Sequence, residues 1–294
     1  MFRIAPQLRA VDIEGHNLPR LAFPSDQLTK LTLRGEFVDS CLIILRRSPH
    51  IINCALGRVR WSAVSRENLE PLVHDQLQSL AFNFQEYNDL VPDFLDALTI
   101  PALREFSCYG GGENFLYSNF ISLVARSSCL LQRLSLHNYQ TTDSHFAELL
   151  RAVPSLVNLS LQEVGITNET LRMLNLSDAN VTDSLLPNLQ AFRWSGSRHD
   201  FNLDFSVLAN FLHSRWDNRK LATSDHDSES SGIARLQSFK FETNECGVPD
   251  AHISAKLEQF AAEGLNIALA TADGCWPRSC VKSIHRRAAC IYHS

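Results

Sequence analysis

A phrase of alternating polar and apolar residues recurs along the chain. In residues 154–171, PSLVNLSLQEVGITNETL, the residues Leu156, Leu159 and Leu161 are separated by mostly polar positions, and a helix-like polar start follows. The spacing L-x-x-L-x-L predicts a strand with one buried face in each copy. The first apolar residues of the nine copies are Leu8, Leu28, Ile51, Leu77, Leu103, Leu131, Leu156, Leu189 and Leu236.

Helical spacing follows the strand phrase in several copies. Apolar residues at i, i+3, i+4 and i+7 predict one amphipathic helix per copy, closed by a proline before the next strand. The residues that show this pattern are Val38, Cys41, Leu42 and Leu45 before Pro49; Phe146, Leu149, Leu150 and Val153 before Pro154; and Leu208, Phe211 and Leu212 after a predicted helix cap at Asp204.

The copies start 20 to 47 residues apart, and most intervals match the period of leucine-rich repeats. A single strand and helix cannot bury the apolar strand face, so neighbouring copies must stack. The sequence therefore predicts an α/β leucine-rich-repeat solenoid with irregular repeats: a curved horseshoe with parallel strands on its concave face and helices on its convex face.

The repeat domain is predicted to occupy residues 1–271. Residues 217–232, DNRKLATSDHDSESSG, fill the longest interval and are poor in apolar residues, so they predict a disordered insertion. Residues 272–294 predict a basic, poorly ordered tail that contains Cys and His.

Composition and charge narrow the class of protein. The chain is 45% hydrophobic with a formal charge of -5, and it has no basic stripe, which argues against a nucleic-acid or anionic-membrane binder. No run of about 18 apolar residues is present, so we expect a cytoplasmic or nuclear protein. Asn-x-Ser/Thr sites at Asn158, Asn168, Asn175 and Asn180 leave a secreted glycoprotein as an alternative.

Motifs of catalysis and metal binding are absent from the sequence. The chain has neither G-x-S-x-G nor H-E-x-x-H, and we predict that it is not an enzyme and needs no cofactor. In the tail, four residues separate Cys275 from Cys280 and Cys280 from His285, which differs from zinc-knuckle spacing. Since four intervening residues do not reliably present two thiolates to one ion, no metal site is predicted.

The strand period of two places polar side chains on the face away from the core. Arg and Tyr among them are types enriched in binding hot spots, so this concave face is the predicted site for a protein partner. The residues are Lys30, Arg34, Asn83, Tyr109, Arg133, His137, Asn158, Gln162, Arg193 and Lys240.

Three segments carry a resemblance to a known family: LTLRGEFVDSCLIILRRSPHIINCAL, DALTIPALREF and ISLVARSSCLLQRLSL. Over residues 6–270 the chain resembles the leucine-rich region of fungal F-box and F-box-like proteins. The resemblance implies a scaffold whose repeats hold a substrate, while a separate N-terminal F-box docks onto the adaptor of a cullin-RING ubiquitin ligase. Because repeats begin within ten residues of Met1, we expect the adaptor as a partner only if an F-box is supplied upstream. The alternative is a fragment or decayed copy without a function of its own.

Overall fold

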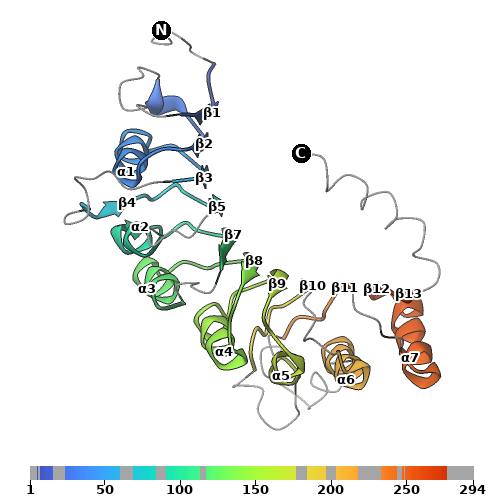
Figure 1. Cartoon of the computed structure of the whole chain (residues 1–294). Coiled ribbons are helices and arrows are strands. Elements are labelled where there is room, and N and C mark those ends of the chain that lie inside the picture. The colour runs from blue at the N-terminus through green and yellow to red at the C-terminus, as the bar shows by residue number, and fades with distance from the viewer. Residues whose placement is uncertain are drawn as a thin grey trace, which may run out of the picture. The chain divides into compact units, whose positions relative to one another are not determined.

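The structure is a computed structural model of the 294-residue chain. It describes residues 5, 7–15, 24–59, 69–83, 91–112, 117–176, 184–196, 203–217, 233–243, 247 and 249–276. The chain divides into two compact units, Met1–Thr141 and Thr142–Ser294. Each unit carries its own run of parallel strands, with helices along one side of them (Figure 1).

In the described part of unit 1, six strands pair in parallel in the order β1-β2-β3-β5-β7-β8. These strands are β1 (Ala10–Glu14), β2 (Lys30–Arg34), β3 (Asn53–Gly57), β5 (Ser79–Asn83), β7 (Glu105–Gly112) and β8 (Arg133–Tyr139). The helices are the 3-10 helix η2 (Ser25–Gln27), α1 (Val38–Arg47), α2 (Val91–Ala97) and α3 (Tyr117–Ser127). The short strands β4 (Leu72–Val73) and β6 (Leu98–Thr99) form a separate parallel pair.

Among the described residues of unit 2, four parallel strands are followed by one antiparallel strand. They are β9 (Asn158–Val164), β10 (Ala191–Gly196), β11 (Ser238–Thr243), β12 (Asn266–Thr271) and β13 (Gly274–Trp276). The helices are α4 (Asp143–Ala152), α5 (Asn168–Met173), α6 (Phe205–Trp216) and α7 (Ala251–Ala262). The alternation of parallel strands and helices predicted from the sequence is confirmed.

Residues at equivalent positions of successive copies of the phrase are partners in the strand register. In unit 1, Leu31 pairs with Cys54, Cys54 with Leu80, and Leu80 with Phe106, and each side chain is at most 2% exposed. In unit 2 the corresponding buried ladder begins at Leu159. Each such burial stabilises the fold by roughly 1.5 to 3 kcal/mol, so the repeated apolar positions supply the core of each unit.

Aromatic side chains pack against one another in the core of unit 2. The ring of Phe192 lies 5.6 Å from Phe239 and 6.0 Å from Phe211 between centroids, both in edge-on geometry. Edge-on pairs add about 0.5 to 1.5 kcal/mol beyond the area that they bury. Strands β10 and β11 are thereby fixed against helix α6.

Three predicted helix positions agree with the structure. Helix α6 begins at the predicted cap, since the carboxylate of Asp204 accepts hydrogen bonds from the backbone N–H groups of Ser206 and Val207. Helix α1 ends at Arg47, before Pro49, and α4 ends at Ala152, before Pro154.

The predicted domain limits differ from the structure. The strand pairing continues past residue 271, because residues 274–276 of β13 pair with β12 after a two-residue turn. The first five residues of the predicted tail therefore belong to the fold. Asp217, the first residue of the predicted insertion, is the C-cap of α6. Residues 218–232 of the insertion and 277–294 of the tail lie outside the described residues.

Candidate functional site

The outward strand face is formed by the strand side chains that alternate with the buried ones. All ten residues predicted for the binding face stand on it, none of them buried. In unit 1 these are Lys30 and Arg34 on β2, Asn83 on β5, Tyr109 on β7, and Arg133 and His137 on β8. In unit 2 they are Asn158 and Gln162 on β9, Arg193 on β10, and Lys240 on β11. Six of the ten residues belong to unit 1 and four to unit 2.

Arginines on the outward strand face pair with carboxylates of other strands. Arg34 Nη2 lies 2.9 Å from Asp12 Oδ2, and Arg133 pairs with Glu105. Exposed ion pairs contribute at most about 1 kcal/mol, so they orient the guanidinium groups more than they stabilise the sheet. The two remaining pairs are Arg58–Glu14 at 2.9 Å and Arg193–Glu242 at 3.3 Å.

Tyr109 and His137 form a stacked pair on neighbouring strands. They are partners in the register of β7 and β8, and their ring centroids lie 4.1 Å apart with 27° between the planes. The phenol is 40% exposed, which is unusual for a large apolar side chain in this fold. Stacking fixes the ring of Tyr109 without burying it, so an aromatic surface remains open to a ligand.

A hollow of about 320 Å³ opens on the outward strand face across β2, β3, β5 and β7. Small side chains make its floor: Thr32, Ala55, Gly57 and Ala81. A Cβ added at Gly57 would touch Arg34 Cγ at 3.5 Å, so the glycine keeps this part of the floor low without being strictly required. The volume lies at the lower end of the range for ligand pockets.

Longer polar side chains make the wall of the hollow: Arg34, Arg58, Asn83 and Tyr109. Arg58 directly follows β3 and has a left-handed φ of 51°. Its backbone N–H donates to the Asn83 carbonyl at 3.0 Å. This conformation interrupts the strand alternation, so the consecutive residues Gly57 and Arg58 both line the hollow.

Sequence reasoning found three of the wall residues and missed Arg58, which lies one position beyond its strand. It also missed the floor. The available signal was a run of small residues, Ala55, Gly57 and Ala81, at outward positions of two adjoining copies. Lys30 stands at the opposite end of β2 and does not line the hollow.

Of the four residues predicted in unit 2, Arg193 and Lys240 are the two that face each other in the strand register. Arg193 is paired across the strands with Lys240 in register, and its guanidinium turns to Glu242. Asn158 and Gln162 are opposite Ala191 and Ser195 on β10. Among the described residues, the hollow and the aromatic stack both belong to unit 1, which makes unit 1 the stronger candidate site.

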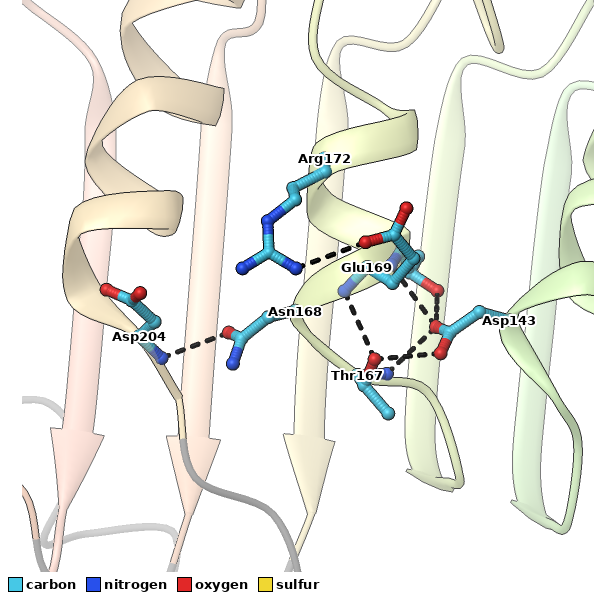
Figure 2. A network of polar contacts seen from close by, with 7 residues as sticks. Asp143, Thr167, Asn168, Glu169, Arg172 and Asp204 are labelled. Carbon is cyan, nitrogen blue, oxygen red and sulfur yellow. Dashed lines mark hydrogen bonds and ion pairs between the residues drawn. The ribbon is translucent and has the colours of Figure 1, made fainter.

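A second polar cluster joins the starts of three helices in unit 2 (Figure 2). The Asp143 carboxylate accepts from Thr167 N at 3.0 Å, from Thr167 Oγ1 at 2.7 Å, and from Thr170 N and Oγ1. Asn168 Oδ1 accepts from the backbone N–H of Asp204 at 3.0 Å. The contacts from Thr167 N, Thr170 N and Asp204 N satisfy backbone donors at helix starts, so the cluster is a chain of helix caps that spans α4, α5 and α6.

The electrostatics of Asp143 agree with this capping role. Partial burial acts to raise the pKa of its carboxyl group, but the hydrogen bonds from Thr170 and Thr167 outweigh burial and hold the pKa below its ordinary value of 3.8. The carboxylate form is therefore the one that the folded unit selects.

Buried thiols do not form a reactive centre in the part of the chain that the structure describes. Burial raises the pKa of Cys54 and of Cys108 to about 12, so both are protonated at neutral pH. Tyr139 donates its hydroxyl hydrogen to the Cys108 sulfur. Among the described residues, no three His, Cys, Asp or Glu side chains are grouped so as to hold a metal ion.

These features define an α/β protein whose parallel strands bury one face beneath helices and present the other as a polar, hollowed surface. Within the described residues, no helix has the length and apolar character needed to cross a membrane. No family model matches the chain, and no curated protein matches it.

A crystal structure of a Bacteroides fragilis protein, a structural genomics target, is similar to the chain with a TM-score of 0.43 and 13% sequence identity. The similarity covers 65% of this chain and 64% of that protein. The chain thus spans less than two thirds of the length of that protein.

Proposed function

We propose that the chain is a leucine-rich-repeat solenoid and that its outward strand face, the concave face of such a fold, binds a protein partner. The interpretation as stacked repeats is supported by the strand register, in which equivalent positions of successive copies are partners. Leu33 pairs with Leu56, and Leu56 pairs with Phe82. Repeats that contact only their neighbours build extended surfaces of this kind.

The main support for this proposal is the open hollow beside the stacked Tyr109–His137 pair. Tyr and Arg dominate binding hot spots because they offer a large contact area and planar hydrogen bonding at a small cost in conformational entropy. Here Tyr109, Arg34 and Arg58 border one concavity and none of them is buried. A partner could therefore bury all three side chains together.

A protein is the proposed partner rather than a nucleic acid because the outward arginines are balanced by carboxylates. Nucleic-acid binding depends on uncompensated positive charge along the surface. The arginines of all four ion pairs described above have an acidic neighbour within the same unit. The proposed role is binding rather than catalysis, with no cofactor.

The resemblance to F-box proteins extends the proposal to the kind of partner. The outward strand face would hold a substrate protein as the repeats of that family do, and a cullin-RING adaptor would join only through an F-box supplied by another segment. The cytoplasm or nucleus is the proposed location. The free and buried thiols of Cys41, Cys54, Cys108 and Cys129 support a reducing compartment.

Replacing both Tyr109 and Arg133 with Ala should weaken partner binding by about 2 kcal/mol or more, because hot-spot truncations have this magnitude. Thermal melts should barely change, since both side chains are exposed. The measurement is quantitative affinity enrichment from an extract of cells that express the chain.

The matched control replaces Glu148 and Arg151, two exposed residues of α4, with Ala. Proteins that lose enrichment with the Tyr109 and Arg133 variant but keep it with the control are the expected partners. Identical enrichment profiles for the wild type, the variant and the control, with matching melts, would show that the binding site is not on the outward strand face.

A further inference from the structure

The wall of the hollow has hydrogen-bond donors that no other described residue uses. A guanidinium group has five N–H donors. Arg34 and Arg58 each use only Nη2 in their ion pairs with Asp12 and Glu14, and neither Nε nor Nη1 is bonded to another described residue. The side-chain amide of Asn83 and the hydroxyl of Tyr109 also have no hydrogen-bond partner among the described residues.

Three contacts hold this wall in place before any ligand arrives. Asp12 and Glu14 fix the two guanidinium groups at 2.9 Å each, and His137 fixes the Tyr109 ring by stacking. Side chains that are already oriented lose less conformational entropy when they bind. Arg34, Arg58 and Tyr109 are therefore oriented before a ligand binds, while the amide of Asn83 has no contact of this kind among the described residues.

The floor of the hollow is weakly polar and the space above it is limited. Ala55, Gly57 and Ala81 offer no charge, and about 320 Å³ admits a side chain with its backbone but not a large cofactor. Strands lie about 4.8 Å apart, so the hollow extends over roughly 14 Å from β2 to β7. An extended segment of about four residues covers that distance.

We propose that this hollow receives an acidic side chain, Glu or Asp, of an extended segment of the partner protein. A carboxylate presents planar paired acceptors that match the free edge of a guanidinium group, and such pairs are about twice as strong as neutral hydrogen bonds. Arg34 and Arg58 take the carboxylate, Asn83 bonds the backbone beside it, and Tyr109 covers a neighbouring side chain. This inference rests on the proposed function and names the chemistry of its site.

The charges around the hollow select one carboxylate over a more highly charged anion. Asp12 and Glu14 stand behind the two arginines and offset their charge. Asp12 and Glu14 would repel a phosphate dianion about twice as strongly as the single charge of a carboxylate, so the unused donors suffice for a carboxylate more readily than for a phosphate. The open sheet face also lets a chain pass through the hollow, which favours a side chain over a chain terminus.

The test uses three pools of synthetic heptapeptides with the full chain. The first pool has blocked ends and a fixed central glutamate, the second is identical with glutamine, and the third has a free C-terminal carboxylate and no acidic side chain. Fluorescence anisotropy should show the glutamate pool binding at least about tenfold more tightly than the glutamine pool. The terminal-carboxylate pool should bind no better than the glutamine pool.

Two variants and one control localise the binding. Replacing both Arg34 and Arg58 with Gln should abolish the glutamate preference, and Ala81→Leu should weaken binding by filling the floor while leaving every charge in place. The control Arg193→Gln removes an equally exposed arginine, also paired with a carboxylate, outside the hollow, and should bind like the wild type.

Equal binding of the glutamate and glutamine pools would overturn the inference, as would a preference for the terminal-carboxylate pool or no binding of any pool. A loss with Arg193→Gln as large as with the hollow variants would do the same. If enrichment of a partner depends on Tyr109 and Arg133 while the glutamate pool fails, the inference is wrong and the proposed function stands.

Discussion

Replacing Arg215 with Ala is expected to lower the free energy of unfolding of unit 2 by about 4 kcal/mol. Arg215 lies in α6, is fully buried, and donates from Nε, Nη1 and Nη2 to the carbonyl oxygens of Leu174, Leu186 and Leu185 at 2.8, 2.8 and 2.6 Å. Burial lowers its pKa to about 10, so the group stays charged at neutral pH. The variant would leave three carbonyl groups without their charged donor.

Arg215 also holds a backbone conformation that is otherwise unfavourable. Leu186 has a left-handed φ of 53°, which costs an L-residue roughly 1 to 2 kcal/mol. The guanidinium group bonds its carbonyl and that of Leu185 from one planar fork. Arg215→Lys keeps the charge but has no fork, so we expect it to lose most of the same stability.

Chemical denaturation followed by circular dichroism measures this effect. The control is Arg172→Ala, which removes an exposed arginine paired with Glu169 three residues before it, and should change the free energy of unfolding by no more than about 0.5 kcal/mol. Equal midpoints for the Arg215 and Arg172 variants would show that the buried fork does not stabilise unit 2.

Asp143→Ala is expected to cost about 2 to 3 kcal/mol at neutral pH, because it leaves the backbone N–H of Thr167 and the hydroxyl groups of Thr167 and Thr170 without their acceptor. Thr170 is fully buried, so its hydroxyl group cannot turn to water.

The cost of Asp143→Ala should depend on pH in a defined direction. The pKa of Asp143 is lowered in the folded state, so its contribution is complete above its ordinary pKa of 3.8 and is lost as the pH falls through the folded value. Urea denaturation of both proteins between pH 7 and about pH 2 should show a constant difference that narrows below about pH 4. A difference that widens on acidification would contradict the capping role.

The sequence alone was enough to predict the strands, because the residue pattern that defines a strand is local. A buried residue at every second position needs only the pleat of a strand, and Leu31, Cys54, Leu80 and Phe106 hold equivalent phrase positions and pair in register. Cys54 shows that the position matters more than the residue type, since the thiol is buried like the leucines that flank it.

Arg215 was missed although the sequence contained a signal. Leu208, Phe211, Leu212 and Arg215 occupy i, i+3, i+4 and i+7, so the arginine stands in the apolar stripe of α6. The carbonyl groups that accept from it come from residues 29 to 41 positions away. Periodicity describes which face a residue occupies, but it cannot reveal distant backbone groups that would satisfy a buried charge.

The sequence predicted only part of the candidate site. Outward positions follow from the strand period, which correctly placed Arg34, Asn83 and Tyr109. The hollow depends on the left-handed turn at Arg58 and on small residues in adjoining copies, and the ion pairs depend on side-chain geometry between strands. The floor and the ion pairs are relations between copies, and the turn at Arg58 is a backbone conformation outside the strand period, so the pattern within one copy predicts none of them.

Photo-crosslinking from inside the hollow tests the outward strand face as a protein-binding surface most directly. A photoreactive phenylalanine analogue placed at Asn83, on the wall of the hollow, is compared with one at Ala125, an exposed position of α3 in the same unit. We expect one defined protein from the expressing cells to crosslink at position 83 and not at position 125. Equal adducts at both positions, or an adduct at position 125 alone, would contradict it.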